Sequence, residues 1–100
     1  MPDVILTPRA DQDLDRAVRY VRRQAPLSAV PWLQRLHAAL RSLSWNPERF
    51  APSRFLAPDG SRYREMLFGR RRGTFRILYR ITPNAVFVHR VIRATVNRIA

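Results

Sequence analysis

The chain has 100 residues, with 19 arginines, no lysine, seven acidic residues and a formal net charge of +12. This length suits one domain with one modest core, and the 46% of hydrophobic residues favours a folded chain over a disordered one. No apolar run approaches the roughly 18 residues of a membrane-spanning helix and the start lacks the pattern of a signal peptide, so we expect a cytoplasmic protein that does not enter the membrane.

The first half of the chain predicts a short strand followed by two helices. The apolar run from Asp3 to Leu6 suits a strand, and Thr7 followed by Pro8 is typical of a helix N-cap with proline at the first helical position. Apolar residues then recur at helical spacing until Pro26. Acidic residues stand near the start of this helix and arginines stand later, an order that suits the helix dipole. We interpret these charged residues, Asp13 among them, as a solvated helix face.

A second helix is predicted to follow closely. Ser28 can serve as its N-cap, and Leu27 and Trp32 are placed to form a hydrophobic staple around that cap. One apolar stripe of leucines follows, Trp45 closes it, and the Asn-Pro step at 46 and 47 stops the helix. Because only about four residues join the two helices, we expect them to pack as an antiparallel hairpin.

The second half predicts strands. Residues 48 to 61 have loop chemistry without clear periodicity, and three strands with short connections are expected over 63–68, 74–81 and 85–92. In the middle strand one face carries Phe75, Ile77, Tyr79 and Ile81, and the other carries Thr74, Arg76, Leu78 and Arg80. The last strand is apolar on both faces, which favours a position between two neighbours. The sequence therefore predicts one α+β domain over 1–100, with a helical hairpin on one face of an antiparallel sheet and the arginine-bearing face partly open.

The candidate chemistry of this chain rests on its arginines. Without cysteine there is no disulfide, thiolate nucleophile or Cys-type zinc site, and the two separated histidines, His37 and His89, cannot form a metal shell, so we expect no metal and no cofactor. Residues 51–100 carry eleven arginines against two acids, which favours a nucleic acid or an acidic protein as partner. Glu65 suits neutralisation of a neighbouring arginine such as Arg76 as well as it suits a catalytic base. Arginines alone favour binding over hydrolysis.

The order of elements and several short motifs resemble one known family. The motifs are L-x-x-L-x-x-x-L in the second helix, R-E-M-L-F-G at 64–69, G-T-F-R-I-L-Y at 73–79 and V-F-V-H-R-V at 86–91. Together they resemble the RelE/ParE superfamily of toxins from type II toxin–antitoxin systems, over nearly the whole chain. The resemblance implies a growth-inhibiting toxin that its cognate antitoxin neutralises in a hetero-oligomer.

The resemblance also implies two alternative targets. RelE-like members cleave messenger RNA on the ribosome, whereas ParE-like members poison DNA gyrase without a shared nuclease site. Many relatives carry a histidine near the end of the last strand, where this chain has Arg93, and His89 favours a core or edge role. We therefore prefer the ParE-like reading. The alternatives are a ribosome-dependent mRNA endonuclease and a nucleic-acid-binding module without toxicity.

The candidate site residues are arginines at positions that match the family's motifs. If the chain is a nuclease, the resemblance assigns the catalytic role to Arg64, Arg76 and Arg93. The candidates for binding a target or the antitoxin are Arg64, Arg70, Arg71, Arg72, Arg76, Arg80 and Arg93.

Overall fold

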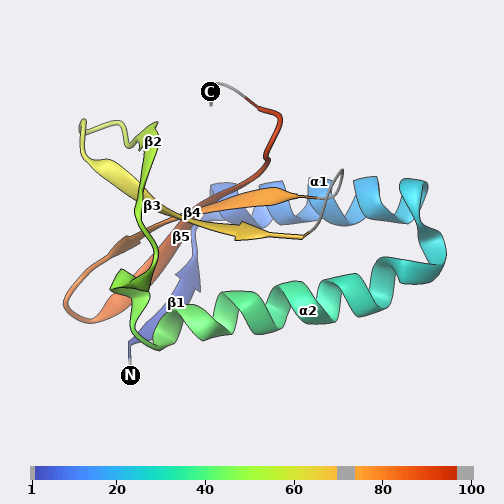
Figure 1. The fold of residues 1–100 in the computed structure, drawn as a ribbon, viewed down its shortest axis with the longest axis horizontal. Coiled ribbons are helices and arrows are strands. Elements are labelled where there is room, and N and C mark those ends of the chain that lie inside the picture. The colour runs from blue at the N-terminus through green and yellow to red at the C-terminus, as the bar shows by residue number, and fades with distance from the viewer. Residues whose placement is uncertain (1, 70–73, 97–100) are drawn as a thin grey trace.

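The computed structural model describes residues 2–69 and 74–96, which form a mixed α/β fold (Figure 1). The helices are α1 (Pro8–Gln24) and α2 (Ala29–Arg41), with short 3₁₀ turns η1 (Pro26–Ser28), η2 (Ser42–Ser44) and η3 (Pro47–Arg49). The strands are β1 (Asp3–Leu6), β2 (Pro52–Leu56), β3 (Arg62–Phe68), β4 (Phe75–Ile81) and β5 (Ala85–Arg93). The predicted fold class, a helical hairpin packed on a sheet, is confirmed.

The strands form one sheet in the order β1-β5-β4-β3-β2. Strands β2 to β5 pair antiparallel with their neighbours, and β1 is the one parallel strand among those described, with Asp3 opposite Ala85 and Leu6 opposite Val88. The first half of β5 therefore lies between two neighbours, as its apolar sequence predicts. Beyond Val88 the edge of β5 is no longer covered by β1, because the chain turns there into α1.

The start of α1 follows from its first residues. Thr7 has extended backbone angles, and its hydroxyl accepts a hydrogen bond from the N–H of Ala10 at 3.2 Å, which satisfies one of the free donors of the first turn. Pro8 occupies the first helical position, where its missing N–H costs nothing. The Thr7 hydroxyl also donates to the carbonyl of His89 at 3.3 Å, so the same cap ties α1 to β5.

The main core lies between the helical hairpin and one face of the sheet. Figure 1 shows α1 and α2 running antiparallel and joined at η1. The ring of Trp32 on α2 lies 5.8 Å from that of Phe68 and 5.6 Å from that of Phe75. The fully buried members of this core include Leu36, Leu43, Ile77, Tyr79, Val86 and Val88. Burial of these side chains is what holds the hairpin on the sheet.

The prediction of a continuous loop over residues 48–61 is wrong, because the segment contains a turn of 3₁₀ helix and the edge strand β2. In β2 the side chains alternate, with Ser53 and Phe55 buried and their neighbours exposed. Two prolines and a bulge in the pairing with β3 hide this period from the sequence. The buried hydroxyl of Tyr79 donates to the carbonyl of Pro47 at 2.6 Å, which anchors the segment to the sheet.

Three expectations about the second helix are also wrong. Leu27 is 97% exposed, so it forms no staple with buried Trp32, and Ser28 makes no capping hydrogen bond with its side chain. The reason is that Pro26–Ser28 forms η1, which carries Ser28 with helical backbone angles directly into α2. Trp45 is 64% exposed and lies 5.6 Å from the guanidinium of Arg49, outside the core.

The second face of the sheet is less open than the sequence predicts. A small second core covers part of it, built from Phe55, Ala57, Tyr63, Leu78 and Ile92. The pairing of β4 with β5 shifts register between Leu78 and Tyr79, so that His89 is the extra residue of a bulge. Arg76 and Arg80 therefore flank a buried apolar patch on this face, and do not stand on a bare sheet.

Candidate functional site

Arg76 lies on the second face of the sheet and is held by Glu65. Its Nη1 donates to Glu65 Oε2 at 2.5 Å, and Nη2 donates to the carbonyl of Ala94 at 3.4 Å. The side chains of Arg76 and Glu65 are 21% and 15% exposed, and Ser53 donates its hydroxyl to the same carboxylate at 2.7 Å. Glu65 thus neutralises Arg76, which is one of the two roles that the sequence suggested for it. The ion pair leaves Arg76 little freedom to reach another anion.

Arg64 is bound to the protein's own backbone. Its Nη1 donates to the carbonyl of Phe50 at 2.7 Å and to that of Glu48 at 3.3 Å. Arg64 stands directly opposite Tyr79 in the β3–β4 pairing, so its side chain leaves the sheet on the face that carries the helices. The residue fastens the segment before β2 to the sheet and points away from Arg76.

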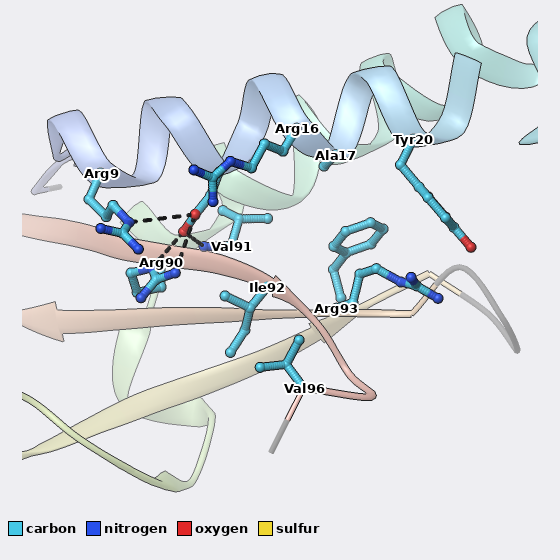
Figure 2. A pocket seen from close by; sticks show the side chains of 11 residues that line it. Arg9, Arg16, Ala17, Tyr20, Arg90, Val91, Ile92, Arg93 and Val96 are labelled. Carbon is cyan, nitrogen blue, oxygen red and sulfur yellow. Dashed lines mark hydrogen bonds and ion pairs between the residues drawn. The ribbon is translucent and has the colours of Figure 1, made fainter. Parts of the chain in front are cut away.

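Arg93 ends β5 and is exposed. It pairs with Phe75 across the sheet, and its guanidinium lies 4.4 Å from the ring centroid of Tyr20 on α1. Figure 2 shows the two side chains beside each other at one end of a hollow between α1 and β5. The structure therefore does not gather Arg64, Arg76 and Arg93 around one point. Arg70, Arg71 and Arg72 lie outside the described residues.

A buried ion pair that the sequence analysis missed forms the other end of this hollow. Asp13 is 4% exposed, and its Oδ2 accepts from Arg90 Nε at 2.7 Å and from the N–H of Val91 at 3.0 Å. The carboxylate thus satisfies the uncovered edge of β5 where β1 has ended. The expectation that Asp13 belongs to a solvated face is wrong. The spacing of Asp13 is the feature that could have predicted its burial, because Ala10, Asp13 and Ala17 share one helix face and all three are buried.

The hollow of Figure 2 has a volume of about 320 Å³. Its walls are largely apolar, with Ala17, Phe75 and Val91 among them, and Arg16 and Arg93 stand at its margin. Arg9 lies 4.0 Å from Asp13, so it adds a weak second contact to the buried pair. An apolar group with a negative charge beside it would fit this arrangement.

Arg80 and His89 line a second hollow, on the other face, of about 550 Å³. Arg80 donates from Nη2 to Asp59 at 3.1 Å, and Ser61, followed by Arg80, lowers the pKa of this exposed carboxyl to about 2. The His89 ring lies 5.4 Å from that of Tyr63. Burial lowers the pKa of His89 below its ordinary 6.5, the charge of Arg80 lowers it further, and Asp59 opposes both effects. The imidazole is therefore neutral near pH 7.

The described residues contain neither a metal-binding cluster nor a membrane-spanning helix. Within 2–69 and 74–96, no group of three or more histidine, aspartate or glutamate side chains could hold a metal ion. Over the same stretches, no helix has the length and apolar character needed to cross a membrane.

The model of one protein family matches residues 4–97 of the chain, that of the ParE toxin of the type II toxin–antitoxin system parDE. The chain belongs to the ParE toxin family. The resemblance stated on the sequence motifs is thereby confirmed, and the ParE family is one of toxins that have an antitoxin partner. No curated protein matches the sequence.

A solved structure agrees with this assignment. A chain of the chromosomal ParDE TA system from P. aeruginosa is similar to this one with a TM-score of 0.72 and 19% sequence identity. The similarity covers 93% of this chain and 96% of that chain. At this level of identity the comparison shows that the two chains share a fold. In this ParE-family chain that fold is a helical hairpin on a five-stranded sheet.

Proposed function

We propose that this ParE-family toxin stops growth by inhibiting DNA gyrase, and that its antitoxin neutralises it in a cytoplasmic hetero-oligomer. The family assignment supports the toxin, and one geometric observation favours gyrase over messenger RNA as the target. The three arginines that a nuclease site would use are dispersed. Arg76 is paired with Glu65, Arg64 is bonded to backbone carbonyls, and Arg93 lies over Tyr20.

Dispersal matters because arginine contributes to phosphodiester cleavage only where its charge meets the reacting phosphate. Several guanidinium groups must converge on one point to stabilise the charge that develops in the transition state. A base must also lie within reach of the attacking hydroxyl. Glu65 is occupied by Arg76 and Ser53, so it is poorly placed to accept that proton.

The alternative is a ribosome-dependent mRNA endonuclease, and His89 is the residue that favours it. A neutral imidazole beside Arg80 has the character of a general base. However, the ring lies in a hollow lined by Tyr63 and Arg80, away from Arg76 and Arg93. If cleavage occurs, we expect it to depend on His89 and not on the three arginines that the family motifs single out.

Among the candidate binding residues that the structure describes, the exposed Arg93 and the partly exposed Arg80 best suit contact with a target or with the antitoxin. In the described part of the chain, Arg93 carries no carboxylate partner and Arg80 is paired only with the exposed Asp59. Surface pairs of this kind are weak and exchange readily for a better partner. Arg64 and Arg76 are committed to internal contacts, so we assign them a supporting role.

Induction of the chain in a bacterial host tests the toxin and the role of Arg93 together. We expect the unmodified chain to stop growth, and co-expression of the antitoxin from the neighbouring reading frame to restore it. Arg93→Ala should need about tenfold more inducer for the same inhibition, because the loss of one charged hydrogen bond to the target weakens binding by about that factor. Arg35→Ala, at an exposed arginine of α2, removes the same charge and should remain fully toxic. Normal growth with the unmodified chain would contradict the proposal.

A further inference from the structure

The hollow around His89 combines groups that suit a small ligand as well as the protein partner to which Arg80 was assigned above. It lies where the start of α1, the end of β2, β3 and β5 meet, and its volume of about 550 Å³ is within the usual range for small-molecule sites. Its walls combine aromatic rings with cations, since Tyr63 and His89 face it together with Arg9 and Arg80. Arginines beside stacked aromatic rings are the ordinary means by which proteins hold unpaired nucleotides.

We propose that this hollow binds one nucleotide, with the base against the His89 ring, which the buried Tyr63 supports, and the phosphate at Arg80 and Arg9. Free nucleotides and the unpaired nucleotides of a single strand present the same chemistry, a flat ring and a phosphate. The site is separate from the Arg93 end of the sheet.

The aromatic wall is built and held in place by the second core. Tyr63 is 4% exposed and packs with Leu78 and Ile92, so the orientation of its ring is fixed before any ligand arrives. The His89 ring is inclined by 40° to it at 5.4 Å, and the bulge in β5 directs it to this side. Near pH 7 the imidazole is neutral, so it adds an aromatic surface without adding another charge.

The arginines of the hollow differ in how strongly their carboxylate partners bind them. Arg90 is buried, and its charge is neutralised by Asp13, so it is not available to a phosphate. Among the described residues, Arg80 has one ion pair, with Asp59, whose side chain is 57% exposed, and Arg9 has only the 4.0 Å contact with Asp13. Both can turn toward a phosphate at small cost, because such exposed or long ion pairs stabilise little. A dianionic phosphate would be a stronger partner than either carboxylate offers.

The two histidines of the chain provide the measurement, since His37 on α2 is exposed and lines a different surface. In the purified full chain, we would follow the imidazole NMR signals of both during titration with thymidine 5′-monophosphate. The His89 signals should shift saturably while those of His37 stay in place. Thymidine alone and inorganic phosphate alone should each bind at least tenfold more weakly, because each makes half of the contacts.

Variants then test which residues hold the nucleotide. Arg80→Met should weaken binding of thymidine 5′-monophosphate about tenfold, whereas Arg35→Met, which removes the same charge from α2, should leave it unchanged. A thymidine trinucleotide that binds more tightly than the mononucleotide would identify single-stranded nucleic acid as the source. One that binds more weakly would identify a free nucleotide.

Three results would overturn the nucleotide site. Equal shifts of His37 and His89 would indicate general attraction to a basic protein. Equal affinity in the Arg80→Met and Arg35→Met variants would remove the phosphate contact. A short polyglutamate peptide that shifts His89 as strongly as the nucleotide would show that the hollow takes an acidic protein segment instead.

Discussion

Asp13→Ala is expected to lower the free energy of unfolding by about 3–5 kcal/mol, the range for breaking a buried ion pair on one side. The substitution leaves the guanidinium of Arg90 buried without its main carboxylate, and it removes the acceptor of the Val91 N–H at the uncovered edge of β5. Unfolding in guanidinium chloride, followed by circular dichroism, measures the change.

Asp15→Ala is the matched control, because Asp15 is an exposed carboxylate on the same helix. Its unfolding midpoint should stay close to that of the unmodified chain. The double variant Asp13→Leu with Arg90→Met should recover much of the loss, since replacing both charges removes the uncompensated one. If Asp13→Ala were no more harmful than Asp15→Ala, the buried pair would not stabilise the fold.

Glu65→Ala is expected to cost about 2–3 kcal/mol of stability, the usual cost of leaving a largely buried charged donor without its partner. Within the described part of the chain, Arg76 would keep only the 3.4 Å hydrogen bond to the carbonyl of Ala94, and its buried Nε has no hydrogen-bond partner there. Ser53, also buried, would lose the acceptor of its hydroxyl proton. Thermal unfolding of the purified variant gives the difference.

The control for Glu65 is the exposed acid of the same face. Asp59→Ala removes the exposed carboxylate that pairs with Arg80 and accepts from Ser61, and its unfolding midpoint should fall clearly less than that of Glu65→Ala. A double variant, Glu65→Leu with Arg76→Met, should be more stable than Glu65→Ala alone. Equal stability of Glu65→Ala and the unmodified chain would mean that Arg76 is free to serve a target.

The sequence predicts much of this fold because local signals and tertiary structure agree there. Thr7 and Pro8 start α1 as expected, and the period of two in β4 places Phe75, Ile77 and Tyr79 together in the main core. The helical stripe of α2 likewise faces inward through Leu36 and Leu40. In each case a single strong periodicity determines which side chains are buried.

The remaining parts of the fold depend on contacts between distant residues. β2 is short and begins with a proline, so it shows no clear period, and it is fixed by its pairing with β3 and by the bond of Ser53 to Glu65. The bulge that turns His89 toward Tyr63 has no local signature. Such features follow from pairing across the sheet, which one sequence does not display.

The sequence predicts which residues belong to the candidate site better than it predicts how they are arranged. The contact of Arg76 with Glu65 was foreseen from their places on neighbouring strands. The separation of Arg64 from Arg76 could be read only once the register of β3 and β4 was known, because a shift of one residue moves a side chain to the other face. The burial of Asp13 goes against the usual exposure of aspartate, and only its position on the same helix face as Ala10 and Ala17 indicates it.

The most direct test of the proposed function is to add the purified chain to DNA gyrase with supercoiled DNA, and separately to ribosomes that carry a defined message. We predict that gyrase-dependent breaks accumulate in the DNA, that the purified antitoxin prevents them, and that the message stays intact. Message cut on the ribosome, with gyrase working normally, would contradict the proposal and identify the chain as an endonuclease.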